Sequence, residues 1–455
     1  QAGSERPFWW KKYKETYIAE IKSMEKITNY LELIQQIQDI TPEKEAFCTT
    51  GKSLTYSQLY ALAKEKQGML KQEKKEFGEQ NAKKQLRIIQ TTCILDQLVE
   101  FLACQGTDWI PVILPADATV PVDEWTQKTW PENACMAVMT SGTSGKNKLL
   151  FRTFGSWYDY FPVQNEIFHI NSESRLFMQG SLAFTGNFNL YMGQLAAGAT
   201  ILAQERFDPR LWIRNIKQWQ ANGIYLIPAK LRALYQALCH EKQAPLPEIR
   251  TILSGSQSLG KEEVAQLKQF FTEAEITLYY GASELSYVTY IRDTQMNDDK
   301  TRIGRPFPGI DVQLEDGRLM VNTKWGVIGT GKEASAGDYA HLDEEGYFCF
   351  DGRKDDICSI NGQKISCIRV EQVILSLGIG SEAAVKPVER QGRQYLAAWI
   401  VPKEKERGKN LEKKTGEIRS QLKTILSQGE IPKFFFFEDT LPVNESGKVL
   451  KRLLE

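Results

Sequence analysis

After an apolar run, the chain continues with Met139-Thr140-Ser141-Gly142-Thr143-Ser144-Gly145-Lys146-Asn147-Lys148. Four residues of this stretch carry hydroxyl groups, two are glycines, and two are lysines that follow the second glycine. Glycines let backbone N–H groups curl around an anion, while hydroxyl and ammonium groups donate hydrogen bonds to phosphate oxygens. The stretch therefore predicts a loop that binds a polyphosphate. A polar surface turn is the alternative that this composition, taken alone, leaves open.

The spacing of the stretch excludes the Walker-type phosphate loop. Counted from Gly142, that motif needs a glycine where Asn147 stands, and no Gly-Lys-Ser/Thr sequence follows. If this loop binds ATP, it therefore does so in another fold.

Strand and helix patterns alternate on both sides of the loop. Upstream, Thr55 and Gln58 form a capping box that predicts a helix start, and residues 87–90 and 109–114 predict two strands around a helical pattern. Downstream, further strands are predicted at 200–202, 224–227, 250–253 and 276–280. Strand, helix and strand joined by short links form right-handed parallel units. The first part of the chain is therefore predicted to be α/β, with wound, mostly parallel sheets.

The pattern changes after Asp351. A helical stripe ends at Gly378, a hairpin is predicted around Gln391-Gly392, and a helix follows a charged segment. The aromatic block 434–437 predicts a buried strand. These features predict a small α+β domain at 352–455 behind a large domain at 1–351, within the two or three domains expected for 455 residues.

Composition limits the class of partner. The chain has 57 basic and 57 acidic residues, so no overall field attracts nucleic acid or an anionic membrane. No apolar run approaches the roughly 20 residues that span a bilayer, and residues 1–12 lack the apolar core of a signal peptide. Eight cysteines without a Cys-x-x-Cys pair indicate reduced thiols and a cytoplasmic location. Three isolated histidines indicate chemistry that does not use histidine or a histidine-bound metal.

The loop resembles the phosphate loop of the acyl-adenylate-forming superfamily, which includes acyl-CoA and aryl-CoA synthetases, peptide-synthetase adenylation domains and luciferases. In that superfamily the loop reads Thr-Ser-Gly-Thr-Thr-Gly-x-Pro-Lys, and this chain differs at Ser144 and Asn147. Further segments that resemble the superfamily's motifs follow in its order: Ser254–Gln257, Tyr280–Glu284, Gly337-Asp338, Gly352–Asp356 with Asn361–Ile365, and Leu441–Lys448. The resemblance spans about Arg87 to Leu454. It implies that the small C-terminal domain is mobile.

The resemblance implies how ATP is held. The phosphate loop would bind the β- and γ-phosphates through Thr140, Ser141, Gly142, Thr143, Ser144, Gly145 and Lys148. Gly255 and Ser256 would line the adenine and acyl pockets. Tyr280, followed by Gly281, would stack on adenine.

Four polar residues complete the implied nucleotide site. Ser283 would contact the α-phosphate, and Glu284 would help to hold Mg²⁺, since a carboxylate is a hard ligand for a hard cation. Asp338 would accept hydrogen bonds from both ribose hydroxyls, and Arg353 would contact ribose or phosphate.

Three residues carry the implied reaction and domain motion. Lys448 would bridge the substrate carboxylate and the α-phosphate, which stabilises charge as the carboxylate attacks. The small domain would then rotate about Asp355, and the loop near Gly362 would line a pantetheine tunnel. Ser359 and Lys364 differ from the superfamily's usual Lys and Arg, which affects thiol transfer more than ATP binding.

The predicted function is ATP- and Mg²⁺-dependent activation of a carboxylic acid to its acyl-adenylate, followed by transfer to the thiol of CoA. The phosphopantetheine arm of an acyl carrier protein is the alternative acceptor. An amino acid substrate is disfavoured, because Phe184-Thr185 stands where amino-acid-activating members carry Asp. The aromatic residues Phe184, Phe188 and Tyr191 suit an acyl or aryl acid, or are part of the core. Two further functions stay open: a phosphotransferase that makes an acyl phosphate, and a non-catalytic nucleotide- or acyl-binding relative.

Overall fold

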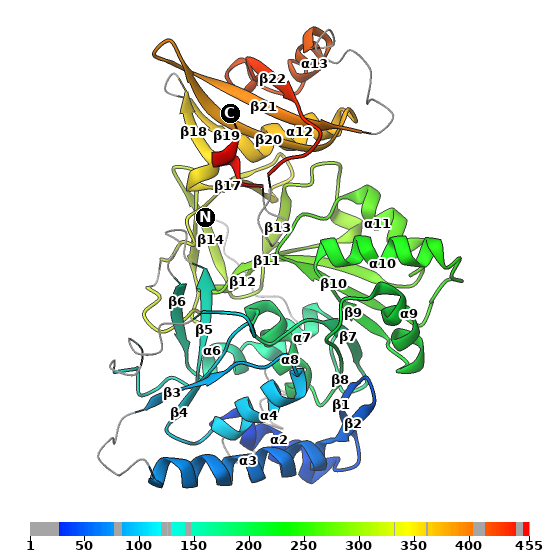
Figure 1. Cartoon of the computed structure of the whole chain (residues 1–455), viewed down its shortest axis with the longest axis vertical. Helices are drawn as coiled ribbons and strands as arrows, with labels where there is room; N and C mark the ends of the chain where they lie inside the picture. The colour runs from blue at the N-terminus through cyan, green and yellow to red at the C-terminus, as the bar shows by residue number, and fades with distance from the viewer. Residues whose placement is uncertain are drawn as a thin grey trace, which may run out of the picture. The chain divides into compact units, whose positions relative to one another are not determined.

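The computed structural model describes residues 27–76, 84–119, 125, 129–141, 147–331, 333–360, 363–403, 415–442 and 449–454 (Figure 1). The chain forms two compact units. Unit 1 comprises Gln1–Asp159 and Gly180–Glu205, and unit 2 comprises Tyr160–Gln179 and Arg206–Glu455. The predicted domain boundary at 351/352 falls inside unit 2 and stays a prediction.

Unit 1 is an α/β unit, as predicted (Figure 1). Its elements are α2 Tyr30–Ile40, β1 Glu45–Thr49, β2 Lys52–Thr55, α3 Tyr56–Glu76, β3 Gln85–Ile89, α4 Ile94–Cys104, β4 Trp109–Ile113, β5 Met136–Ser141, β6 Asn147–Arg152, α6 Gly155–Tyr158, α8 Thr185–Ala196 and β8 Thr200–Gln204. Strands β3, β4 and β5 are parallel, and β6 is antiparallel to β5. Strand β1 pairs in parallel with β8 and antiparallel with β2. The strands predicted at 87–90, 109–114 and 200–202 are therefore confirmed as β3, β4 and β8.

Local sequence sets the start of α3 and the packing around α8. The backbone N–H of Thr55 donates to Oε1 of Gln58 at 3.0 Å, and the N–H of Gln58 donates to Oγ1 of Thr55 at 3.3 Å. This reciprocal pair is the predicted capping box, and it satisfies two N–H groups that a helix start leaves free. Around α8, the Phe188 ring packs edge-on against Phe101 and Trp157, with centroids 4.7 Å and 5.5 Å away. Aromatic burial of this kind fixes α8 in the core of the unit.

Unit 2 contains strands in the order β14-β15-β16-β17-β13-β12-β11-β10-β9-β7. Up to residue 353 its elements are α7 Phe161–Ile167, β7 Arg175–Gln179, α9 Pro209–Gln218, β9 Gly223–Tyr225, α10 Pro228–His240, β10 Thr251–Gly255, α11 Lys261–Lys268, β11 Glu275–Ala282, β12 Ser286–Arg292, η1 Asp293–Gln295, β13 Arg302–Pro306, β14 Asp311–Glu315, β15 Arg318–Asn322, β16 Asp338–Leu342 and β17 Phe348–Arg353. Strands β7, β9, β10 and β11 are parallel, and the pairs from β11 to β14 are antiparallel. All of β10 is buried, as expected for a strand covered on both faces. The predicted strands in this region are confirmed, while the alternating pattern did not indicate the antiparallel half.

The C-terminal part of unit 2 is α+β, as predicted. Its elements are η2 Lys354–Asp356, β18 Ile357–Ile360, β19 Gln363–Ser366, α12 Cys367–Ser376, β20 Gly380–Arg390, β21 Arg393–Pro402, α13 Thr415–Leu422, η5 Gln428–Glu430, β22 Phe434–Phe437 and η6 Lys451–Leu453. The hairpin of β20 and β21 turns at Gln391 and Gly392, whose φ angles of 53° and 70° are those of a primed hairpin turn. The block 434–437 is a strand parallel to β21, but it is half-buried and not fully buried. A buried cluster that includes Val370, Ile374 and Leu422 forms the core.

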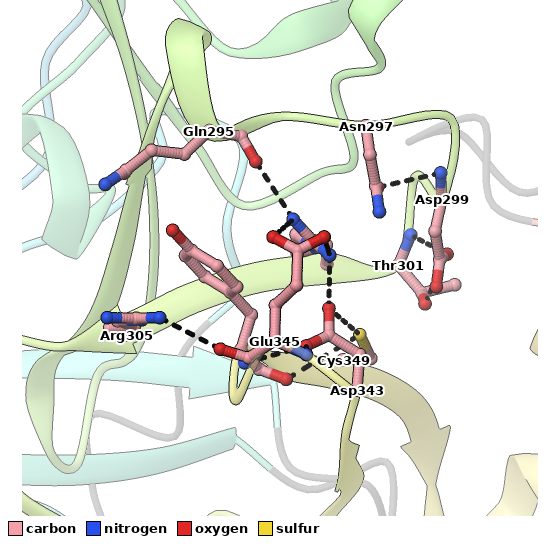
Figure 2. Close-up of polar contacts among 10 residues, drawn as sticks. Gln295, Asn297, Asp299, Thr301, Arg305, Asp343, Glu345 and Cys349 are labelled. Atoms are coloured by element: carbon pink, nitrogen blue, oxygen red, sulfur yellow. Dashed lines mark hydrogen bonds and ion pairs between the residues drawn. The ribbon is translucent and has the colours of Figure 1, made fainter.

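The buried Arg302 joins β13 to the turn that precedes β17 and that carries Asp343 and Glu345, both labelled in Figure 2. The Arg302 side chain is 5% exposed, and its Nη2 lies 2.5 Å from Oδ2 of Asp343 and 3.2 Å from Oε1 of Glu345. Its guanidinium also lies over the Tyr347 ring, 4.5 Å from the centroid. A buried charge is costly unless it is paired and hydrogen-bonded. Here Nη1 and Nη2 have acceptors, whereas Nε has no hydrogen-bond partner among the described residues. The cluster therefore defines how the turn before β17 lies against β13, while its net contribution to stability is small.

Across the described ranges, no helix is both long enough and apolar enough to cross a membrane.

Candidate functional site

The predicted phosphate loop joins the two strands of a hairpin in unit 1. In this hairpin Thr140 of β5 pairs with Lys148 of β6, and Ser141 pairs with Asn147. Strand β5 is largely buried, whereas Lys148 is exposed where β6 begins. The predicted residues Gly142, Thr143, Ser144 and Gly145 lie outside the described residues. The hairpin thus places Thr140 and Lys148 at the two ends of the predicted loop.

Three of the predicted nucleotide residues come together in unit 2. Tyr280 lies near the end of β11, and its hydroxyl donates a short hydrogen bond to Oδ2 of Asp338, the first residue of β16. Arg353 ends β17 and pairs with Asp338 across the strands. Its Nε lies 3.4 Å from Oδ1 of Asp338. Residues separated by up to 73 positions in the sequence (280 to 353) therefore form one cluster.

The acid of this cluster, Asp338, is almost completely buried. Its side chain is 5% exposed, and Oδ1 accepts no hydrogen bond from any residue in the described ranges. Burial raises the pKa of Asp338 above its usual value, and the charges of Glu284 and Asp356 raise it further, against the lowering effects of Tyr280 and Arg353. Buried polar atoms in folded proteins are nearly always hydrogen-bonded. A buried carboxylate oxygen without a hydrogen bond is therefore a ready acceptor for a ligand hydroxyl, which is what a ribose supplies.

Backbone geometry at the carboxyl ends of β10 and β11 requires the predicted glycines. A Cβ on Gly255 would lie 2.6 Å from the ring of Tyr279, and a Cβ on Gly281 would lie 2.4 Å from the carbonyl oxygen of Ser286. Ser256, directly after β10, is exposed and has a φ of 69°, which is uncommon for a residue other than glycine. Ligands of α/β sheets bind outside the carboxyl ends of the parallel strands, where this unusual backbone lies.

Ser283 and Glu284 lie in the turn between β11 and β12, and both side chains are half-buried. The backbone carbonyl of Glu284 accepts a hydrogen bond from Val327 N–H at 2.9 Å, which fixes the turn. Burial and the charge of Asp338 raise the pKa of Tyr280, and the nearby Glu284 raises it further. The described residues contain no group of three or more His, Cys, Asp or Glu side chains that could hold a metal. One carboxylate does fit Mg²⁺, because this ion is commonly held by one or two carboxylates together with substrate phosphates.

The remaining predicted residues are placed only in part. Asp355 lies in η2 between β17 and β18, and nothing is described of its side chain. Gly362 and Lys448 lie outside the described residues. Of the aromatic residues proposed for an acyl pocket, Phe188 and Tyr191 are fully buried in unit 1, which favours the core alternative, and Phe184 is 64% exposed.

One ionisable residue at the carboxyl edge of the parallel strands was missed by the sequence analysis. Lys230 lies in the first turn of α10, and its Nζ donates to the carbonyl oxygen of Gln179, the last residue of β7, at 2.8 Å. Burial lowers the pKa of Lys230 to about 8. The available signal was a lysine directly after the apolar junction Ile227-Pro228-Ala229, where a strand gives way to a helix.

Known proteins resemble this chain in sequence and in fold. The model of the AMP-binding enzyme family matches residues 65–330. An uncharacterized acyl-CoA ligase of Bacillus subtilis, YhfT, is 24% identical over 338 residues, which cover 70% of this chain and 68% of YhfT. The o-succinylbenzoate CoA synthetase MenE of Bacillus subtilis, solved with its acyl-adenylate intermediate, is 20% identical, with a TM-score of 0.77 over 95% of this chain and 99% of MenE. The amide bond synthetase McbA of Marinactinospora thermotolerans is 17% identical, with a TM-score of 0.75 over 93% and 98%.

Proposed function

Because the chain belongs to the AMP-binding enzyme family, we propose that it is an acid–thiol ligase. It activates a carboxylic acid with ATP and Mg²⁺ and passes the acyl group to the thiol of CoA. The observation that carries this proposal is the cluster of Tyr280, Asp338 and Arg353. In this cluster the buried Oδ1 of Asp338 accepts no hydrogen bond from the described residues, so it can accept one from a ligand hydroxyl. MenE, with the same fold, was solved with an acyl-adenylate.

The first half-reaction joins the acid to AMP. A carboxylate oxygen of the substrate attacks the α-phosphorus, the bond to the β-phosphate oxygen breaks, and pyrophosphate leaves. An ionised carboxylate needs no general base, so the protein contributes orientation and electrostatic stabilisation. Asp338 holds the ribose hydroxyls, Thr140 and Lys148 flank the phosphates, and Lys448 stabilises the negative charge that develops at the α-phosphate.

Mg²⁺ is assigned to Glu284. When bound, the ion neutralises phosphate charge. Glu284 is suited to this role because it is half-buried in a turn that a backbone hydrogen bond fixes. It also lies close enough to Tyr280 and Asp338 for its charge to raise their pKa values.

The second half-reaction moves the acyl group. The sulfur of CoA attacks the acyl carbon, the bond to the adenylate oxygen breaks, and AMP leaves. We assign the hinge to Asp355 and a role in lining the thiol tunnel to the loop at Gly362. An acyl carrier protein carries the same thiol and is the alternative acceptor. We also propose a cytoplasmic location, which is consistent with eight free cysteines.

The test is carboxylate-dependent release of pyrophosphate from Mg-ATP. The acids are acetate, octanoate, palmitate, benzoate and phenylalanine, each with and without CoA and with EDTA in place of Mg²⁺. We expect release with an acyl or aryl acid, loss of release with EDTA, and turnover that requires CoA. Release of ADP would support an acyl-phosphate reaction, and the absence of pyrophosphate with every acid would favour a non-catalytic binding protein.

The Lys448→Ala variant separates chemistry from binding. We expect it to bind ATP nearly as well as wild type while losing most of its adenylation, because Lys448 acts on charge that develops in the transition state. Lys423→Met, which removes an exposed lysine of the same region, is the matched control. Wild-type adenylation by Lys448→Ala would overturn the assignment of Lys448.

A further inference from the structure

A second lysine near the C-terminus makes contacts that a surface lysine would not make. Lys451 begins η6, three positions after Lys448. Its Nζ lies 2.7 Å from Oε1 of Glu371 in α12 and 3.3 Å from Oδ1 of Asp356 in η2. The side chains of Lys451, Glu371 and Asp356 are 25%, 12% and 20% exposed. One ammonium group therefore joins three segments of the chain.

The acceptor on α12 is itself fixed. Oε1 of Glu371 also accepts a hydrogen bond from the backbone N–H of Val385 in β20, at 2.7 Å. Burial alone would lower the pKa of Lys451, but the charges of Glu371 and Asp356 outweigh it and raise the pKa. Lys451 is therefore charged and held between two carboxylates. Burying such a group gains little net stability, because desolvation offsets the attraction. The contact is better explained by the position that it defines.

A backbone hydrogen bond next to Lys451 joins residues on the two sides of the segment that carries Lys448. The N–H of Leu450 donates to the carbonyl oxygen of Pro442 at 2.7 Å, so a backbone hydrogen bond joins residues on the two sides of segment 443–448. Leu441 and Leu454 are buried in one cluster on the two sides of this bond. Lys451 directly follows Leu450, and its ion pair links this hydrogen-bonded junction to Asp356, the residue after the assigned hinge.

From these contacts we infer that Lys451 is a positioning residue for Lys448. It anchors the residues that flank the Lys448 segment, Pro442 and Leu450, to Asp356 beside the assigned hinge. The inference rests on the proposed function. Its physical content is that Lys451 ties the residues that flank the Lys448 segment to Asp356, next to the assigned hinge. Misplacement of a catalytic group by about 1 Å can cost roughly a hundredfold in rate.

The anchor predicts a difference between the two half-reactions. Adenylation needs Lys448 in place, whereas transfer from a preformed acyl-adenylate to CoA proceeds after Lys448 has moved away. Loss of the anchor should therefore slow adenylation by about a hundredfold and leave transfer close to the wild-type rate. A residue that only stabilises the fold would lower both rates through the same loss of folded protein.

The experiment compares Lys451→Met, which keeps the length of the side chain, with Lys451→Arg, which keeps the charge. Adenylation is measured as acid-dependent ATP–pyrophosphate exchange with the best acid of the panel above. Transfer is measured with the chemically synthesised adenylate of that acid and CoA. We expect Lys451→Met to lose exchange only, Lys451→Arg to recover most of it, and Lys423→Met to match wild type in both assays.

A double variant tests whether Lys451 acts through Lys448. Residues that act as one unit are not additive, so Lys451→Met should cause no further loss of exchange in a Lys448→Ala background. Glu371→Gln, which keeps the shape of the acceptor, should show the same selective loss to a smaller degree and serves if Lys451→Met does not fold. Equal loss of both half-reactions, no loss in either, or full additivity with Lys448→Ala would overturn the inference while the proposed function stands. A wild-type protein without exchange would overturn both.

Discussion

Replacing Asp338 with Asn tests the nucleotide site most directly. The substitution keeps the size of the side chain and an oxygen that can accept from the Tyr280 hydroxyl, but it removes the negative charge. In the folded protein Asp338 is nearly inaccessible to solvent, and its Oδ1 accepts no hydrogen bond from the described residues. Asp338→Asn therefore changes how a ribose is held with little change in packing.

The expected loss of affinity follows from two hydrogen bonds. Hydrogen bonds to a charged group contribute roughly 1.5–3 kcal/mol each, and neutral ones about 0.5–1.5 kcal/mol. Exchanging two charge-assisted acceptor contacts for one neutral contact should cost about 2.5–4.5 kcal/mol. The corresponding weakening of ATP binding is about 60-fold to about 1,600-fold.

The same substitution should stabilise the fold at neutral pH. Burial raises the pKa of Asp338, so the folded state favours the protonated carboxyl more than the unfolded state does. The stability that this group contributes is present below its unfolded pKa and is lost as pH rises through the higher folded pKa. Asn carries no charge at any pH. The free energy of unfolding of Asp338→Asn should therefore exceed that of wild type at pH 7, and the difference should shrink toward about pH 4.

Two measurements check this combination. Isothermal titration with Mg-ATP in the absence of an acid gives the affinity, and urea denaturation at several pH values gives the stability. Asp311→Asn, at an exposed position of β14, is the matched control and should change neither. Wild-type affinity in Asp338→Asn, or a loss of stability at pH 7, would refute the role assigned to this carboxylate.

Four further predictions concern stability. Gly255→Ala should destabilise the fold by about 1–3 kcal/mol in urea denaturation, because its Cβ overlaps the Tyr279 ring. Gly68→Ala, in a helix with open space at that position, should instead stabilise by about 0.5–1 kcal/mol. Burial lowers the pKa of Lys230 to about 8, so wild-type stability should rise between pH 8 and 10.5, and Lys230→Met should flatten that rise in denaturation series. The hydrogen bond to Asp351 raises the pKa of His341. Its contribution to the free energy of unfolding is therefore present below pH 6.5 and is lost as the pH rises through the raised pKa. His341→Gln should remove this loss of stability above pH 6.5 in thermal unfolding, and an unchanged pH profile would contradict it.

Local patterns predicted the elements that depend on neighbours in the chain. The capping box of Thr55 and Gln58 starts α3, and the pair Gln391-Gly392 forms the turn of its hairpin. Strands β4, β8, β9 and β10 were predicted because strands buried on both faces are apolar along their length. The antiparallel half of unit 2 was not predicted. Its outer strands β14 and β15 alternate between exposed and more buried residues, which leaves short, mixed patterns.

In the candidate site, too, the sequence nominated residues, and only the tertiary structure showed their contacts. Motif order alone nominated Tyr280, Asp338 and Arg353, but their contact, the burial of Asp338 and its raised pKa come from pairing between distant strands. Lys230 and Lys451 carry no motif signal. Only packing shows that one is buried against a strand end and that the other is held between two acids.

By itself, the sequence determined the α/β class and the family, and it nominated the residues that we propose for adenylation, because the motifs fix the spacing of glycine, hydroxyl and carboxylate groups. The tertiary structure alone decided which of those groups are dehydrated and how they are paired. A pKa, a buried acceptor without a hydrogen bond and a lysine held between two acids all depend on what surrounds a side chain, and segments far apart in the chain supply those surroundings.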